Sequence, residues 1–205
     1  MTLAIIAITC LVSLVAMSNV RIMQQLWFEP FVIKARGDWF RFVTHAFVHA
    51  DRFHLFVNML VLYMFGTNVE VLYGRLDDGP SMLPFIFLYL GGILFSALPS
   101  YKKHIHNPNY RAVGASGATS AVLFAHILML PTAPLQLIIL PGVNIPGWIF
   151  GIAYLAFEWY QDKRGGDNVA HDAHFYGALY GIAFTALLEP SLITGLLASI
   201  GLLQS

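Results

Sequence analysis

The chain has 205 residues, of which 58% are hydrophobic and only 11% are charged, and its mean hydropathy is +0.68. Soluble domains carry about a quarter charged residues, so this composition predicts an integral membrane protein. The net charge is zero and no basic tract contains interleaved aromatic residues, which argues against nucleic acid as a partner. The single cysteine, Cys10, has no partner within the chain, so an intrachain disulfide is excluded.

Six apolar runs approach the length of about 20 residues that a helix needs to cross a bilayer. They lie at residues 2–18, 53–73, 81–99, 114–131, 145–161 and 171–189. The first run lacks the basic start and small-residue cleavage site of a signal peptide, so we interpret it as a span. We therefore expect an all-α, polytopic membrane protein, with a single six-span domain over residues 1–205.

The links between these runs differ in character. Residues 18–52 are rich in aromatic and basic side chains, which favours a long loop in the membrane interface between the first two helices. Residues 131–146 are proline-rich and uncharged. A further apolar piece, 192–203, follows Glu189-Pro190 and is short for a span, so we expect a continuation of the sixth helix or an interfacial tail.

Ser116 begins the fourth run, within Gly114-Ala115-Ser116-Gly117. The first turn of a helix has free backbone N–H groups and a dipole that favours negative charge. A hydroxyl at this position is either a helix cap or a nucleophile whose own N–H helps to hold an oxyanion. The rest of the sequence has to decide between the two interpretations.

Polar groups near the starts of three runs point to the second interpretation. Runs two, four and six cross in the same direction, so their N-terminal ends share one side of the membrane. His54 and Asn58 lie near the start of run two, Ser116 starts run four, and His174 starts run six. Polar groups inside spans face other helices or a water-filled cavity. We therefore expect these four residues to converge.

The chemistry of acyl transfer assigns each of them a role. A serine nucleophile needs a base, for which a histidine such as His174 is the usual group. The Ser116 N–H, His54 and Asn58 could stabilise the oxyanion, since His54 and Asn58 are one helical turn apart on one face. Gly177 and Gly181 form a GxxxG pattern, which predicts close packing of the sixth helix against the fourth.

Three segments resemble the motifs of the rhomboid intramembrane serine proteases, in their order and spacing: His49 to Asn58, Gly114 to Gly117, and Ala173 to Gly181. The resemblance implies a Ser116/His174 dyad without a third acidic member, and an oxyanion hole formed by the Ser116 N–H, His54 and Asn58. It also implies a six-span fold with a water-accessible cavity, in contact with membrane lipid. The substrates would be single-pass membrane proteins, cut within or beside the transmembrane segment, and no metal or organic cofactor is implied.

The sequence departs from the family pattern at three places. Many members have Tyr four residues after the serine, packed against the catalytic histidine, whereas this chain has Ser120. The family's Trp-Arg pair of the first loop is interrupted here, as Trp39-Phe40-Arg41. A second histidine, His171, lacks the following glycine that His174 has, so we choose His174 as the base. Three residues are candidates for orienting it: Tyr176, Asp172 and His171.

Two other functions remain open. His45 with His49, or His171 with His174, could share a metal ion, but no carboxylate or cysteine in the sequence completes either set, which favours structural or interfacial roles. The second alternative is a non-catalytic rhomboid-like protein that binds substrate helices without cutting them. Ser120 keeps this alternative open, although both Ser116 and His174 are present.

The distribution of positive charge conflicts with the resemblance. Ten of the eleven Lys and Arg residues lie in or beside the links after runs one, three and five, and only Arg75 lies on the other side. The positive-inside rule would place the Ser116 side in the cytoplasm. Bacterial rhomboid proteases have the opposite orientation, and a chain with six spans and no transit peptide fits a bacterial cytoplasmic (inner) membrane. We follow the resemblance.

Overall fold

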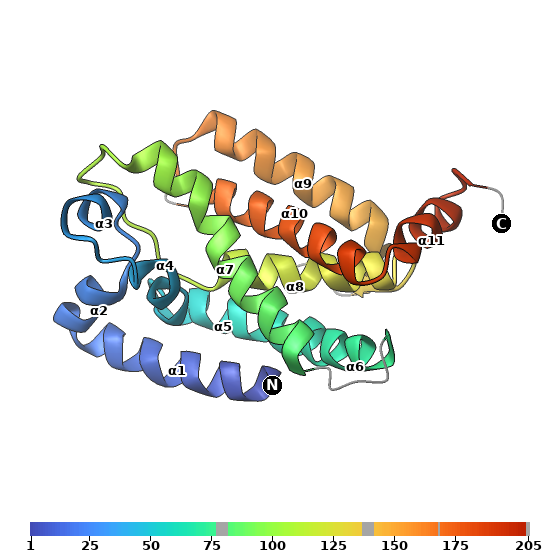
Figure 1. Cartoon of the computed structure of the whole chain (residues 1–205), viewed down its shortest axis with the longest axis horizontal. Coiled ribbons are helices and arrows are strands. Elements are labelled where there is room, and N and C mark those ends of the chain that lie inside the picture. Colours follow the sequence, from blue (N-terminus) through green and yellow to red (C-terminus); the bar gives the residue numbers. More distant parts are fainter. Residues whose placement is uncertain (77–81, 137–141, 168, 204–205) are drawn as a thin grey trace.

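The computed structural model describes residues 1–76, 82–136, 142–167 and 169–203, and most of them are helical. The elements are α1 (Thr2–Ser18), α2 (Val20–Leu26), α3 (Pro30–Arg36), α4 (Arg41–Thr44), the 3₁₀ turn η1 (His45–Phe47), α5 (Arg52–Val61), the π-helical turn η2 (Leu62–Gly66), α6 (Thr67–Leu76), α7 (Met82–His104), α8 (Ser116–Met129), β1 (Pro134–Gln136), β2 (Asn144–Pro146), α9 (Gly147–Arg164), α10 (His171–Leu188) and α11 (Ser191–Ser199) (Figure 1).

Two helices in the described ranges are long and apolar enough to cross a membrane: the continuous α5–η2–α6 segment, Arg52–Leu76, and α7. The bent pair α10 and α11 would provide a third span, while α1 and α8 are apolar but shorter. The chain is therefore a membrane protein. All six expected runs contain a helix, but six membrane crossings stay a prediction.

One local expectation needs correction, and the structure narrows a second. The expected all-α chain contains a short antiparallel hairpin, in which β1 pairs with β2 and Leu135 lies opposite Ile145. This hairpin lies within the proline-rich link 131–146, part of which is outside the described residues. The final apolar piece forms α11, which is bent by 116° from α10 and is therefore no straight continuation of it. Pro190 lies at this bend, where its ring cannot continue a regular helix.

Helix α8 forms the centre of the molecule. Every residue from Gly117 to Leu128 is buried, and the helix is enclosed by α7, α10, α9 and the α5–η2–α6 segment (Figure 1). A helix that is apolar on all sides is stable only when it is surrounded in this way. The N-terminal ends of α5, α8 and α10 lie at the same end of the molecule, as their common direction requires.

Helices α8 and α10 touch through backbone rather than side chains. A Cβ atom on Gly177 would lie 2.2 Å from the carbonyl oxygen of Gly117, and one on Gly181 would lie 2.1 Å from that of Ala121. Both contacts advance by four residues in the same direction, so the helices are parallel. The expected packing of the sixth helix against the fourth is confirmed. Gly177 and Gly181 are required there because any side chain would clash with the backbone of α8.

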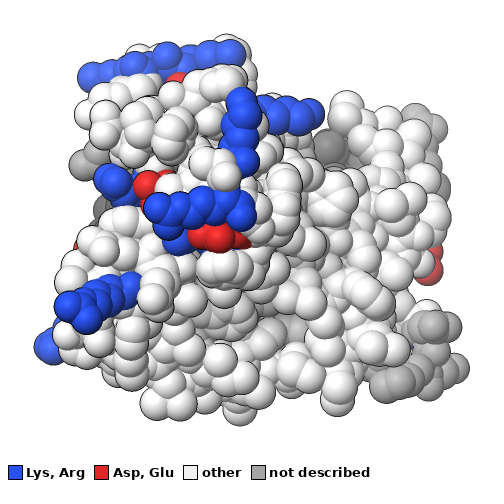
Figure 2. Space-filling model, turned by 60° about the vertical axis from the view of Figure 1, so that its left-hand side comes forward, with Lys and Arg blue, Asp and Glu red and all other residues white. Residues whose placement is uncertain are grey.

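Charge is distributed unevenly along the molecule. Figure 2 shows Lys and Arg side chains gathered toward one end of the visible face, with a surface of mostly uncharged residues beyond them. This end carries α2, α3 and the link that leads into α8 (Figure 1). The site-bearing ends of the helices therefore lie at the more basic end of the protein.

The Gly177 contact makes a stability prediction. We expect Gly177→Ala to lower the free energy of unfolding by about 1–3 kcal/mol, because α8 and α10 must separate to accommodate the methyl group. Thermal unfolding of the detergent-solubilised protein, followed by circular dichroism, measures the change.

Gly195→Ala is the matched control, since a Cβ atom at Gly195 in α11 would meet nothing within 4 Å. Alanine is also the better helix former there. Equal melting temperatures for the two variants would contradict the backbone contact.

Candidate functional site

Residues 112–115, which precede Ser116, are held by the long loop between α1 and α5. Phe28 and Ala112 exchange two backbone hydrogen bonds, of 2.9 and 3.0 Å. The N–H of Gly114 donates to the carbonyl oxygen of His45 at 2.9 Å, and the N–H of Ala115 donates to Nε2 of His49 at 3.3 Å. The loop thereby sets the position at which α8 begins.

Arg41 holds that loop together. Its guanidinium is buried and donates to the carbonyl oxygens of Gln24 and Trp27, at 2.9 and 3.0 Å, and to Asp38 at 3.2 Å. Trp39 is instead 58% exposed. Of the interrupted Trp-Arg pair, the arginine therefore makes the buried hydrogen bonds of the loop, because its five donors can satisfy several carbonyl groups at once, whereas Trp39 stacks on Phe42.

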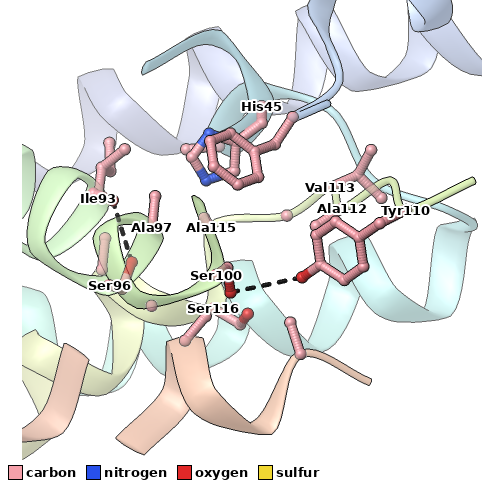
Figure 3. A pocket seen from close by; sticks show the side chains of 17 residues that line it. His45, Ile93, Ser96, Ala97, Ser100, Tyr110, Ala112, Val113, Ala115 and Ser116 are labelled. Atoms are coloured by element: carbon pink, nitrogen blue, oxygen red, sulfur yellow. Dashed lines mark hydrogen bonds between the residues drawn. The ribbon is translucent and has the colours of Figure 1, made fainter. Parts of the chain in front are cut away.

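Ser116 is the first residue of α8, and Ala115 is the N-cap. No side-chain cap bond is present, so the interpretation of Ser116 as a helix cap is wrong. The Ser116 hydroxyl has no hydrogen-bond partner among the described residues. It is half-buried at a cavity with about 20 Å³ of free space, enough for about one water molecule (Figure 3). Ser96, Ser100 and Tyr110 also line this cavity.

His54 lies directly against the segment before Ser116. A Cβ atom on Gly114 would be 2.7 Å from Cε1 and 2.8 Å from Nε2 of His54. Gly114 also has a φ of +114°, in the region that favours glycine, so this position excludes a side chain on two grounds. Asp51 is the N-cap of α5, and its carboxylate accepts a hydrogen bond of 2.8 Å from the N–H of His54.

Asn58 connects α5 to α8. It is buried, and its Nδ2 donates to the carbonyl oxygen of His54 at 2.9 Å. Its Oδ1 accepts a hydrogen bond of 3.2 Å from the hydroxyl of Thr119, three residues beyond Ser116 in α8. The structure thus brings His54 and Asn58 to the start of α8. Their roles in chemistry stay predictions.

His174 lies in the first turn of α10, beside the start of α8. Ala170 and Ala173 line the same cavity as Ser116, and a Cβ atom on Gly117 would lie 3.4 Å from the carbonyl oxygen of Ala173. Among the described residues no hydrogen bond joins Ser116 to His174. The structure therefore brings the two residues to neighbouring helix turns without a direct bond between them.

A buried carboxylate that we did not expect holds the His174 ring. Oε1 of Glu158, in α9, lies 3.1 Å from Nδ1 of His174. An ionised carboxylate only accepts hydrogen bonds, so Nδ1 carries the proton and the neutral ring keeps its lone pair on Nε2. The side chains of Glu158 and His174 are only 6% and 18% exposed. This bond presents Nε2 as the basic nitrogen.

None of the three residues that we expected to orient His174 is bonded to it. Asp172 accepts a hydrogen bond of 2.6 Å from Ser100, Tyr176 is 43% exposed, and His171 binds the other oxygen of Glu158. The sequence did contain a signal for Glu158, since a carboxylate near the end of an apolar run needs a polar partner. What it lacked was the identity of that partner on another helix.

Ser120 occupies the position where many rhomboid proteases have Tyr. Here the Ser120 hydroxyl lies 2.8 Å from the hydroxyl of Tyr154, which comes from α9. Tyr154 is one turn before Glu158 on that helix. A tyrosine therefore approaches this part of the site from a neighbouring helix, because the smaller serine leaves space for it.

His45 and His49 have structural partners rather than the geometry of a metal site. Nδ1 of His45 is bonded to the carbonyl oxygen of Arg41 at 2.9 Å. Nδ1 of His49 is 2.8 Å from the hydroxyl of Ser13, and its Nε2 accepts the Ala115 N–H. Burial lowers the pKa of His45 from 6.5 to about 4 and that of His49 to about 3. Both rings are therefore neutral at pH 7.

These two pKa values predict that acid destabilises the fold. In the unfolded chain both histidines bind protons near pH 6.5, whereas in the fold they do so only near pH 4 and 3. The stability that depends on these two neutral rings is therefore complete above pH 6.5 and is lost as the pH falls to about 4 for His45 and about 3 for His49, by at most about 1.4 kcal/mol per pH unit for each ring. Chemical unfolding at several pH values measures this slope.

His49→Gln should reduce the slope, while His106→Gln, which removes an exposed histidine, should leave it unchanged. A slope in His49→Gln as steep as that of the wild type would contradict the assignment.

Comparisons with known proteins agree with the motifs. The family model described as the Rhomboid domain matches residues 36–191. "RHOMBOID-like protein 12, mitochondrial" of Arabidopsis thaliana is 29% identical over 174 residues, which cover 76% of this chain and 49% of that protein. "Presenilin-associated rhomboid-like protein A, mitochondrial" of Danio rerio is 31% identical over 141 residues, covering 68% and 35%.

"Rhomboid-related protein 1" of Caenorhabditis elegans is 30% identical over 164 residues, which cover 75% of this chain and 41% of that protein. The chain thus spans less than half the length of these curated relatives. The family model nevertheless covers most of the chain, including all the candidate site residues. The chain belongs to the rhomboid family.

Proposed function

We propose that this protein is an intramembrane serine endopeptidase that cleaves single-pass membrane proteins within or beside their transmembrane segment. The observation that carries the proposal is the combination at the start of α8 and α10. There a serine hydroxyl, with no hydrogen-bond partner among the described residues, lies in a helix turn that neighbours the turn of a histidine, and Nδ1 of this histidine is bonded to a buried carboxylate. Membership of the rhomboid family supports the same activity.

The proposed reaction begins when Oγ of Ser116 attacks the carbonyl carbon of the substrate and Nε2 of His174 takes the hydroxyl proton. The negative oxygen of the tetrahedral intermediate is held by the Ser116 N–H, His54 and Asn58. The C–N bond then breaks, His174 returns the proton to the leaving amine, and an acyl-enzyme remains. Water attacks the ester, with His174 again as the base, and restores the serine.

Glu158 adds an acidic group to the dyad that the resemblance implies. Its bond to Nδ1 holds the ring in the tautomer that accepts a proton on Nε2, and its charge stabilises the imidazolium that forms. His171 shares the same carboxylate at 2.5 Å. In this proposal Glu158 is a positioning residue, since it acts on the substrate only through His174.

Fluorophosphonate labelling of the purified protein tests this reaction. The probe reacts with an activated serine, so we expect labelling of the wild type and none of Ser116→Ala or His174→Ala. Glu158→Gln should label about a hundredfold more slowly, because the amide can donate to Nδ1 and favour the wrong tautomer.

Asp172→Asn is the control for loss of a buried carboxylate on this side of the molecule, since Asp172 is bonded to Ser100 and not to His174. It should label at a rate close to that of the wild type. Absence of labelling in a folded wild type would favour a non-catalytic protein that binds membrane helices. The lack of a hydrogen bond between Ser116 and His174 would agree with that function.

We further propose six membrane crossings, with the Ser116 end facing outward from a bacterial cytoplasmic membrane. The helices at all six apolar runs support the number of crossings, and the resemblance supports the orientation. The names of two of the relatives given above describe them as mitochondrial, so the choice of a bacterial membrane is itself part of the proposal. The basic residues at the Ser116 end argue for the opposite orientation.

An alkaline phosphatase fusion after Lys103, in the last turn of α7 at the Ser116 end, tests the orientation. The reporter folds only outside the cytoplasm, so we expect an active fusion. A fusion after Arg75, at the other end, should be inactive. The reverse pattern would place the site in the cytoplasm.

A further inference from the structure

Glu158, His171 and His174 form a cluster with the composition of a metal site. Each offers one ligand atom, and these atoms all lie within 4.8 Å of one another. His171 contributes Nδ1, 2.5 Å from one carboxylate oxygen, and His174 contributes Nδ1, 3.1 Å from the other. The expectation that no carboxylate completes a metal site beside these two histidines is therefore wrong, because α9 brings Glu158 to them.

Asp167 gives the cluster an outer partner. Its Oδ2 lies 3.0 Å from Nε2 of His171, the nitrogen that faces away from Glu158. Metal-bound histidines commonly donate their second N–H to a carboxylate, which fixes the ring and leaves the other nitrogen for the metal. The ring of His171 is thus held with Nδ1 directed at the centre of the cluster. The side chain of Asp167 is 44% exposed, so the cluster lies near solvent.

The donor set selects the kind of ion. Zinc binds imidazole nitrogen and carboxylate oxygen at about 2.0–2.2 Å, so two ligand atoms of a tetrahedral ion lie about 3.4 Å apart. The ligand atoms of the cluster lie within 4.8 Å of one another, so each separation must change by about 1.4 Å or less to reach this spacing. Magnesium and calcium prefer all-oxygen sites, whereas two imidazoles and one carboxylate suit zinc. We propose that Glu158, His171 and His174 bind a divalent transition-metal ion of the zinc class, and that this ion switches off His174.

The inhibition follows from the tautomers of His174 and rests on the proposed function. With Glu158 alone, Nδ1 carries the proton and Nε2 is free to take the proton of Ser116. A metal ion needs the lone pair of Nδ1, so the single proton of the neutral ring moves to Nε2. In that state His174 has no lone pair to act as a base. The same carboxylate that activates His174 without metal therefore helps to hold the inhibiting ion.

Cobalt and zinc binding test the site independently of proteolysis. We would titrate Co²⁺ into the full-length Ser116→Ala variant in detergent, follow its visible absorption, and displace it with Zn²⁺. We expect one ion per chain, loss of the signal in His171→Gln, and binding weaker by about 10–100-fold in Asp167→Asn, which keeps all three ligands. His106→Gln removes an exposed histidine elsewhere and should bind as the parent does.

Equal binding by His171→Gln and its parent would overturn the site, as would no binding by the parent. Asp167→Asn covers the case in which His171→Gln does not fold.

Labelling with the fluorophosphonate probe tests the inhibition. Zn²⁺ should slow labelling of the wild type at least tenfold, and a chelator should restore it. For His171→Gln, the rate with Zn²⁺ is compared with its own metal-free rate and should change less than twofold. Zinc bound with labelling unchanged would overturn the inhibition. Metal binding by a protein that never labels would overturn the proposed protease activity and leave the metal site standing.

Discussion

The backbone contact between α8 and α10 is the constraint on which the rest of the structure depends. At Gly117 and Gly177 the two helices are so close that a single Cβ atom would lie 2.2 Å from a carbonyl oxygen. Because the helices are parallel, this contact also sets the first turns of both at the same height. Ser116 and His174 lie in those turns, so the packing of small residues sets the separation between these two side chains.

A second constraint is the burial of Glu158. A carboxylate among apolar helices needs compensating partners, and here it finds two imidazoles on α10. Asp167 faces the other side of His171, so both nitrogens of that ring lie beside carboxylates and each must carry a proton when both carboxylates are ionised. One acidic side chain thereby links the orientation of His174 to the occupancy of the proposed metal site. Helices α9 and α10 and the link between them bring these groups together.

The long loop between α1 and α5 completes the site from the opposite side. Through Phe28, His45 and His49 it binds three positions of the chain just before Ser116. His54 then lies against Gly114, which has no side chain to exclude it. The buried Arg41 holds this loop together, and its neutral histidines bind the segment that leads into α8.

Much of this could be predicted from the sequence, because the signals concerned are local or periodic. Apolar runs predicted helices in the right places, the GxxxG pattern predicted the contact of Gly177 with α8, and the order of three motifs predicted the family. The common direction of the even-numbered runs also predicted that His54, Asn58, Ser116 and His174 would meet at one end.

The tertiary structure alone decided which side chains face one another across helices. The partner of His174 is Glu158, from a helix whose sequence shows no motif, and the tyrosine beside Ser120 is Tyr154 from that same helix. Periodicity shows which face of a helix is apolar, but the rotation and height of α9 against α10 depend on the packing of the whole bundle. The sequence by itself determined the family and the residues that converge, and the structure determined how the histidine is held, because side-chain contacts between helices are not encoded in local pattern.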